Sequence, residues 1–120
     1  MIIQMTTFHH SDGDNRPISE QFRIIAKRWV EADHAASLME ETRTAILSEI
    51  IAKTISHDIA MPYNKAEMAA KSSADYRVFV SKMVELRKQA NLFKVQMEYI
   101  RMRFSEEQSA QATARSERRL

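Results

Sequence analysis

A seven-residue repeat in the second half of the chain constrains the fold more than any other feature. An α-helix with this repeat presents one apolar seam along its length, and another helix has to cover that seam. The sequence therefore predicts one long helix over residues 74–106, about 50 Å in length at a rise of about 1.5 Å per residue. Two interleaved apolar sets form the seam: Tyr76, Met83, Ala90, Met97 and Phe104, and Phe79, Leu86, Phe93 and Ile100.

A second long helix is predicted over residues 18–56. Its apolar residues recur at spacings of three and four, with one gap of seven at Arg43, which is typical of an amphipathic helix. Pro17 favours a first helical turn, in which the Glu20 carboxylate faces the positive end of the helix dipole. The predicted stripe is Ile18, Phe22, Ile25, Trp29, Ala32, Ala36, Met39, Ile46 and Ile50, widened by Leu47, Ile51 and Ile55.

The two long helices are separated by a break that contains Pro62, since proline removes a backbone donor and clashes with the preceding turn. Asn64, followed three residues later by Glu67, resembles a capping box and predicts a short helix over 65–71. The spacing of Glu67 and Lys71 adds a favourable ion pair to that helix.

We therefore expect an all-α fold: a long antiparallel, coiled-coil-like helical hairpin with a short helix at its elbow. Ser72 and Ser73 offer a cap for the helix that follows the elbow. A chain of 120 residues with a single glycine and two prolines lacks the turn-formers that a many-stranded fold needs.

The periodicity also predicts how the chain is organised. Residues 1–16 show no periodicity and are expected to form a flexible N-terminal arm. Residues 17–106 are expected to form the helical hairpin. Beyond Phe104 the apolar pattern fails, so that residues 107–120 are expected to be a polar tail, either helical or frayed.

Composition excludes several classes of function. The absence of cysteine excludes a disulfide framework, a thiolate zinc site and a cysteine nucleophile. One glycine cannot build a phosphate-binding loop, and the carboxylates are scattered along the helices, so we expect no enzymatic activity and no cofactor. No apolar run is long enough for a membrane span or a leader, and we expect a cytoplasmic protein.

Two groups of residues have spacings that metal sites use. His9, His10, Asp12 and Asp14 lie close together, and imidazole with carboxylate binds transition metals. Glu31 and His34 have the Glu-x-x-His spacing of di-iron helical bundles, but those sites need the motif twice and it occurs here once. We therefore predict no metal site.

The charges of the two long helices are complementary. Residues 18–58 carry seven acidic against five basic side chains, whereas residues 74–104 carry seven basic against three acidic ones. Arg87, Lys94 and Arg101 repeat every seven residues beside the seam, the position from which coiled-coil helices pair charges with a neighbour. Two interpretations stay open: these residues pair with acidic residues of the other helix or of another subunit, which we favour, or they bind nucleic-acid phosphates.

A second apolar face lies on the side of residues 92–104 that points away from the seam. At 100° per residue it comprises Leu92, Val95, Tyr99 and Met102. One partner helix cannot cover both faces, and a second subunit suits a protein of this size. We therefore predict a homo-oligomer with these four residues at its interface.

The segment from Tyr76 to Phe104 resembles small helical proteins encoded by phages and prophages of proteobacteria. The likeness is carried by Arg87, Lys88, Ala90, Asn91 and Leu92, and then by the run Glu98 to Phe104. It covers about residues 20–118 and implies a phage accessory role, alongside DNA recombination or replication, without catalytic or binding residues to carry over. We expect a non-enzymatic helical interaction protein, with a nucleic-acid-binding accessory factor as the alternative.

Overall fold

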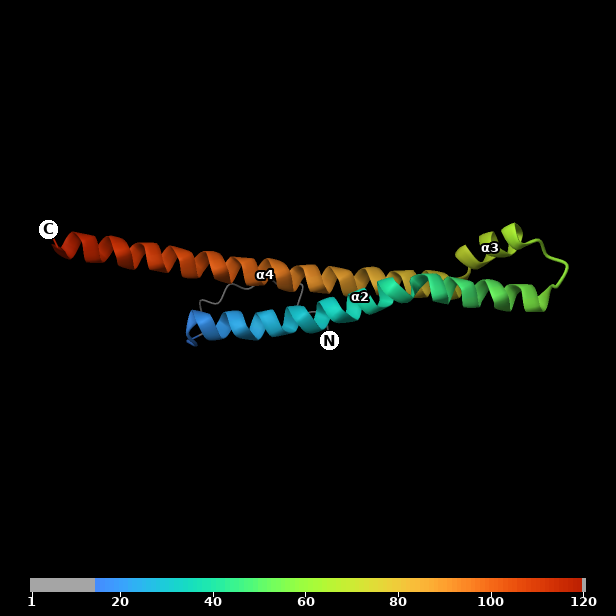
Figure 1. Ribbon diagram of the computed structural model, residues 1–120, viewed down its shortest axis with the longest axis horizontal. Coiled ribbons are helices and arrows are strands. Elements are labelled where there is room, and N and C mark those ends of the chain that lie inside the picture. Colours follow the sequence, from blue (N-terminus) through green and yellow to red (C-terminus); the bar gives the residue numbers. More distant parts are fainter. Residues whose placement is uncertain (1–14, 120) are drawn as a thin grey trace. The chain divides into compact units, whose positions relative to one another are not determined.

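The computed structural model describes residues 15–119, and these residues form helices without strands (Figure 1). Helix α2 spans Ile18–His57, α3 spans Tyr63–Lys71 and α4 spans Ala74–Arg119. The predicted all-α helical hairpin with a short helix at its elbow is confirmed. Helix α2 ends within one residue of the predicted position. Helix α4 continues beyond residue 106 to Arg119, so that residues 107–119 are helical, which is one of the two alternatives expected for the polar tail.

Helix α3 begins earlier than the capping-box interpretation predicted. Pro62 has an extended backbone, and its carbonyl accepts the amide of Ala66 at 3.0 Å. This bond closes the first turn from Pro62, so that Asn64 already lies inside the helix and makes no side-chain cap. The prediction of an Asn64 cap was therefore wrong, because Pro62 starts the helix itself. The expected Glu67–Lys71 ion pair does form, at 3.3 Å.

Ser73 caps the start of α4, as one of the two candidate serines was expected to do. Its hydroxyl oxygen accepts the Tyr76 amide at 3.2 Å and its hydroxyl donates to the Ala70 carbonyl at 2.6 Å. One side chain thereby gives the Ala70 carbonyl, which also accepts the Ser73 amide, a further donor and satisfies a free amide in the first turn of α4. The elbow turns through Ser72 and Ser73 without glycine.

The described residues divide into two compact units. The elbow unit comprises residues 33–88, and the terminal unit comprises residues 15–32 and 89–119. In the elbow unit, α3 lies beside the end of α2, and its fully buried Ala66 and Ala70 pack with Ile51. Alanines have little bulk, which allows the two helices to approach closely. Around this cluster pack Leu47, Ile50, Ile55 and Met61.

The seam inferred from the seven-residue repeat is the face that α4 buries. In the elbow unit the buried residues of α4 are Tyr76 and Met83, and in the terminal unit they are Ala90, Phe93 and Ile100. Every one of them is a seam position.

Polar Gln21 of α2 is buried in the terminal unit, although the sequence did not indicate it as a core residue. Its amide nitrogen donates to the Arg16 carbonyl at 2.7 Å.

Candidate interaction surfaces on the second long helix

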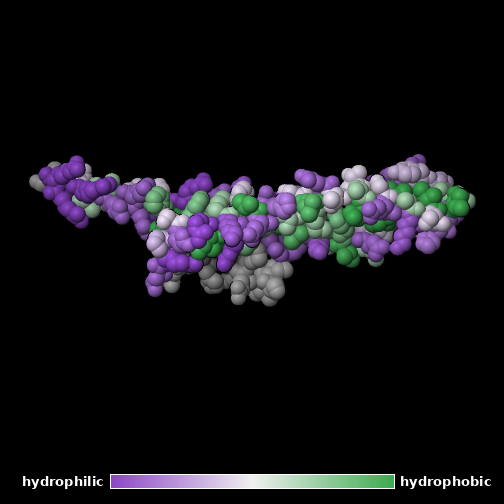
Figure 2. Space-filling view, turned by 60° about the horizontal axis from the view of Figure 1, so that its bottom comes forward, coloured by the Kyte–Doolittle hydropathy of each residue, from purple (hydrophilic) through white to green (hydrophobic). Residues whose placement is uncertain are grey.

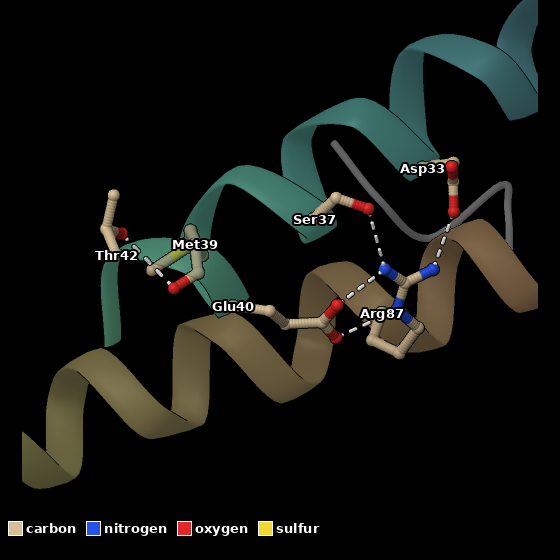
Figure 3. A network of polar contacts seen from close by, with 6 residues as sticks. All are labelled: Asp33, Ser37, Met39, Glu40, Thr42 and Arg87. Atoms are coloured by element: carbon tan, nitrogen blue, oxygen red, sulfur yellow. Dashed lines mark hydrogen bonds and ion pairs between the residues drawn. The ribbon is translucent and has the colours of Figure 1, made fainter. Parts of the chain in front are cut away.

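Arg87 of α4 links the two long helices within the elbow unit (Figure 3). Its Nε and Nη2 donate to the two carboxylate oxygens of Glu40 at 2.9 and 2.7 Å. Its Nη1 donates to Asp33 at 2.7 Å, and Nη2 also reaches the Ser37 hydroxyl at 3.2 Å. The planar guanidinium therefore binds one carboxylate with two parallel bonds and a second with another, a geometry that lysine cannot reproduce.

Arg87 and the carboxylates bound to it shift one another's pKa values. Hydrogen bonding from the Arg87 guanidinium holds the pKa of Glu40 below its ordinary value. The bonds to Glu40 and Asp33 in turn raise the pKa of Arg87. One positive charge faces two negative ones, so the cluster has an excess of negative charge and is a poor site for a phosphate.

The seven-residue repeat indicates Arg87 as a charge-pairing residue but does not indicate its partners. Asp33, Ser37 and Glu40 follow one another at spacings of four and three, which places them on one face of α2. The partners could have been found from this spacing, because it lines up three polar side chains on one side of α2. Such a row can pair with a basic residue on the helix that packs against it.

The interruption of the α2 stripe at Arg43 has a similar explanation. Arg43 Nε donates to the hydroxyl of Tyr76 at 3.0 Å, within the elbow unit. The phenol of Tyr76 is buried along its ring and needs a partner at its polar end. An arginine therefore takes the place of an apolar residue at this point of the stripe.

The other two basic residues of the repeat lie in the terminal unit and have different surroundings. The guanidinium carbon of Arg101 lies 5.7 Å from the centre of the Phe22 ring, within the range of a cation–π contact. Lys94 is exposed on α4. The structure therefore does not bring Arg87, Lys94 and Arg101 into one kind of site: Arg87 binds carboxylates, Arg101 lies over an aromatic ring and Lys94 faces solvent.

The outer face of α4, defined as Leu92, Val95, Tyr99 and Met102, is partly uncovered. Val95 is 50% exposed and Met102 is 61% exposed. Leu92 and Tyr99 are half-buried. The structure thus leaves two of the four predicted interface residues largely in solvent, on a helix whose seam face is already packed.

A small groove lies where α2 begins, within the terminal unit. Its volume is about 260 Å³, and its floor is mainly apolar. Phe104, the last residue of the repeat, lines it and is 44% exposed. The lining residues are Ile18, Ser19 and Phe22 of α2 with Ile100, Arg101 and Phe104 of α4.

The metal candidates gain no support within the described part of the chain. Residues 15–119 contain no group of three or more histidine, aspartate or glutamate side chains placed to hold an ion, and Glu31 with His34 belongs to no such group. His9, His10, Asp12 and Asp14 lie outside the described residues.

Among the described helices, none has an apolar stretch of the length needed to cross a membrane.

No family model, no curated protein and no solved structure matches this chain. Its function is therefore inferred from its own surfaces.

Proposed function

We propose that the protein is a non-enzymatic helical interaction protein that self-associates through the outer face of α4. The exposure of Val95 and Met102 carries this proposal, because both are large apolar side chains on the side of α4 away from the buried seam. Burying apolar surface contributes about 25 cal/mol per Å², so a second helix laid along this face would be stabilised by it. A twofold dimer would use the same face of both copies.

The alternative is a nucleic-acid-binding factor that uses the basic repeat of α4. The contacts of Arg87 favour the interaction function over this alternative. Its guanidinium is already bound to two carboxylates of α2, which leaves less positive charge for phosphates than the repeat by itself suggests. The resemblance over residues 20–118 supports an accessory role among phage-encoded proteins, and we place that role in the cytoplasm.

Sedimentation equilibrium at micromolar concentrations tests self-association. We expect the native protein to be at least a dimer, and a Val95→Glu/Met102→Glu double variant to be monomeric with an unchanged helical circular dichroism spectrum. The control is Ile59→Glu/Met68→Glu, which places the same charges at side chains that are 87% and 73% exposed and that do not belong to α4. A native protein that sediments as a monomer overturns the proposal.

A second measurement separates the two functions. Fluorescence anisotropy with single- and double-stranded DNA at two salt concentrations should show weak, salt-sensitive binding at most, with a slope near 0.9 per phosphate contacted. The informative variant is Lys88→Gln/Lys94→Gln, which leaves Arg87 and its links to α2 in place. Tight binding at physiological salt that this variant abolishes would favour the nucleic-acid function.

A further inference from the structure

Helix α4 continues past the point where α2 begins. Phe104 lines the groove together with Ile18, the first residue of α2, and the helix then runs on to Arg119. Residues 105–119 add about 22 Å of helix at about 1.5 Å per residue. All of them are exposed except Ala114, which is half-buried. This end of α4, at the left of Figure 2, is mostly hydrophilic.

The seam register continues through this tail segment, residues 105–119, although its residues are no longer apolar. Counting on from Phe104 by alternate steps of three and four gives four further seam positions: Glu107, Gln111, Ala114 and Arg118. The first carries a negative charge, the last carries a positive charge, and the two between them are uncharged. The seam of the tail segment is therefore charged oppositely at its two ends.

That charge pattern selects one way for two tail segments to pair. In a parallel pair, Glu107 would face Glu107 of the second copy and Arg118 would face Arg118, which gives two repulsive contacts. In an antiparallel pair, Glu107 faces Arg118 of the second copy and Gln111 faces its Ala114. Each contact then occurs twice, as a twofold interface requires, and both ionic contacts are attractive.

Within the described residues, the tail segment buries almost none of its side chains. Arg115 lies three and four residues before Arg118 and Arg119, a spacing at which like charges destabilise a helix. Glu107 and Arg118 form no ion pair with another of residues 15–119. Pairing with a second helix would supply the missing charge partners.

We propose that residues 105–119 form a self-complementary docking segment that binds the same segment of a second copy in antiparallel orientation. The overlap covers about four turns and its seam is polar, so this contact is weak. Polar seam residues in coiled coils fix the orientation of the helices at a cost in stability, and the same is expected here. It uses a different part of α4 from the outer face and does not rest on the proposed function. Where both contacts operate, assemblies larger than a dimer result.

Charge reversal tests the pairing in the full chain that carries Val95→Glu/Met102→Glu, so that outer-face association is removed. Glu107→Arg turns two attractions into two repulsions, and Arg118→Glu does the same. We expect each to raise the dimer dissociation constant about tenfold. The combined Glu107→Arg/Arg118→Glu variant restores both contacts and should return to within about threefold of its parent. Sedimentation over a concentration series that reaches the millimolar range measures each constant.

The matched control is Glu106→Arg, which makes the same charge change one residue away from the seam and should leave the constant nearly unchanged. Absence of dimer throughout the series, or failure of the combined variant to restore association, overturns the docking segment. Either result leaves the outer-face proposal standing if the native protein with an intact outer face still associates.

Orientation has a separate readout, since a cysteine-free chain accepts a single introduced cysteine for spin labelling. In the antiparallel pair, the Ser105 residues of the two copies lie at opposite ends of the overlap, which separates labels on Ser105→Cys by about 22 Å along the axis. Labels on Ala112→Cys, near the twofold axis, lie close together. Short distances at both positions would mean a parallel pair and would overturn the proposal.

Discussion

The elbow unit and the terminal unit are built from the same two long helices but use their surfaces differently. In the elbow unit, α3 covers the end of α2, and the Arg87 and Arg43 side chains join α2 to α4 through hydrogen bonds. In the terminal unit no third helix is present among the described residues, Val95 and Met102 remain exposed, and the end of α4 runs on without α2. The difference between the units therefore lies in how α4 is joined to α2: by hydrogen bonds from Arg87 and Arg43 in the elbow unit, and by the contact of Arg101 with the Phe22 ring in the terminal unit.

The largest expected effect tests whether the elbow core carries stability. Ile51→Ala leaves a cavity in the cluster closed by α3, since Ile51 is only 5% exposed. We expect it to lower the free energy of unfolding by about 2–3 kcal/mol. Urea denaturation followed by circular dichroism measures the change. The control is Ile59→Ala, at a side chain that is 87% exposed, where a change within about 0.5 kcal/mol is expected. Equal effects at both positions would contradict an elbow unit stabilised by this core.

A smaller effect is expected at the polar link of the elbow unit. Arg87→Gln removes three ionic contacts, but Asp33 and Glu40 are each 40% exposed and can regain water. We expect a loss of about 1 kcal/mol in the same denaturation experiment. Lys88→Gln is the matched control, because it removes the neighbouring positive charge at an exposed position. No difference between the two variants would mean that the link adds nothing to the stability of the unit.

The same link predicts a direction of pH dependence. The pKa of Glu40 is lowered from its ordinary value of 4.5 by the hydrogen bonds from Arg87, while Arg87 stays charged. The contribution of Glu40 to stability is therefore complete above that ordinary value and is lost as the pH falls through the lower folded-state pKa. Carboxyl resonances followed by NMR titration should show the low Glu40 pKa, and its return to the ordinary value in Arg87→Gln.

The smallest effect is expected in the terminal unit, at the contact between Arg101 and Phe22. Arg101 is exposed, and an exposed cation–π contact contributes about 0.5 kcal/mol. Arg101→Gln should therefore destabilise the protein by about that amount, measured by denaturation at low protein concentration. Lys94→Gln, which lies one repeat earlier, should have no measurable effect. A loss as large as that in Arg87→Gln would remove the contrast between the two units.

Most of the helical architecture followed from local and periodic features of the sequence. The seam positions Tyr76, Met83, Ala90, Phe93 and Ile100 are the buried residues of α4, because a seven-residue repeat places them on one side whatever covers them. Pro62 interrupts the helix through its own covalent structure, and Ser73 caps α4 through bonds to residues three positions away on either side. Such features require no knowledge of distant contacts.

The partners of individual side chains were decided by the tertiary structure. Asp33, Ser37 and Glu40 face Arg87, and Arg43 faces Tyr76, only at one axial register of α2 against α4. A shift of one turn, about 5.4 Å, would preserve the apolar stripes yet give Arg87 different neighbours. Periodicity determines which face of a helix is buried, since it depends on one helix alone. Register depends on how the side chains of two helices and the closely packed elbow fit together, and one-dimensional spacing does not contain that information.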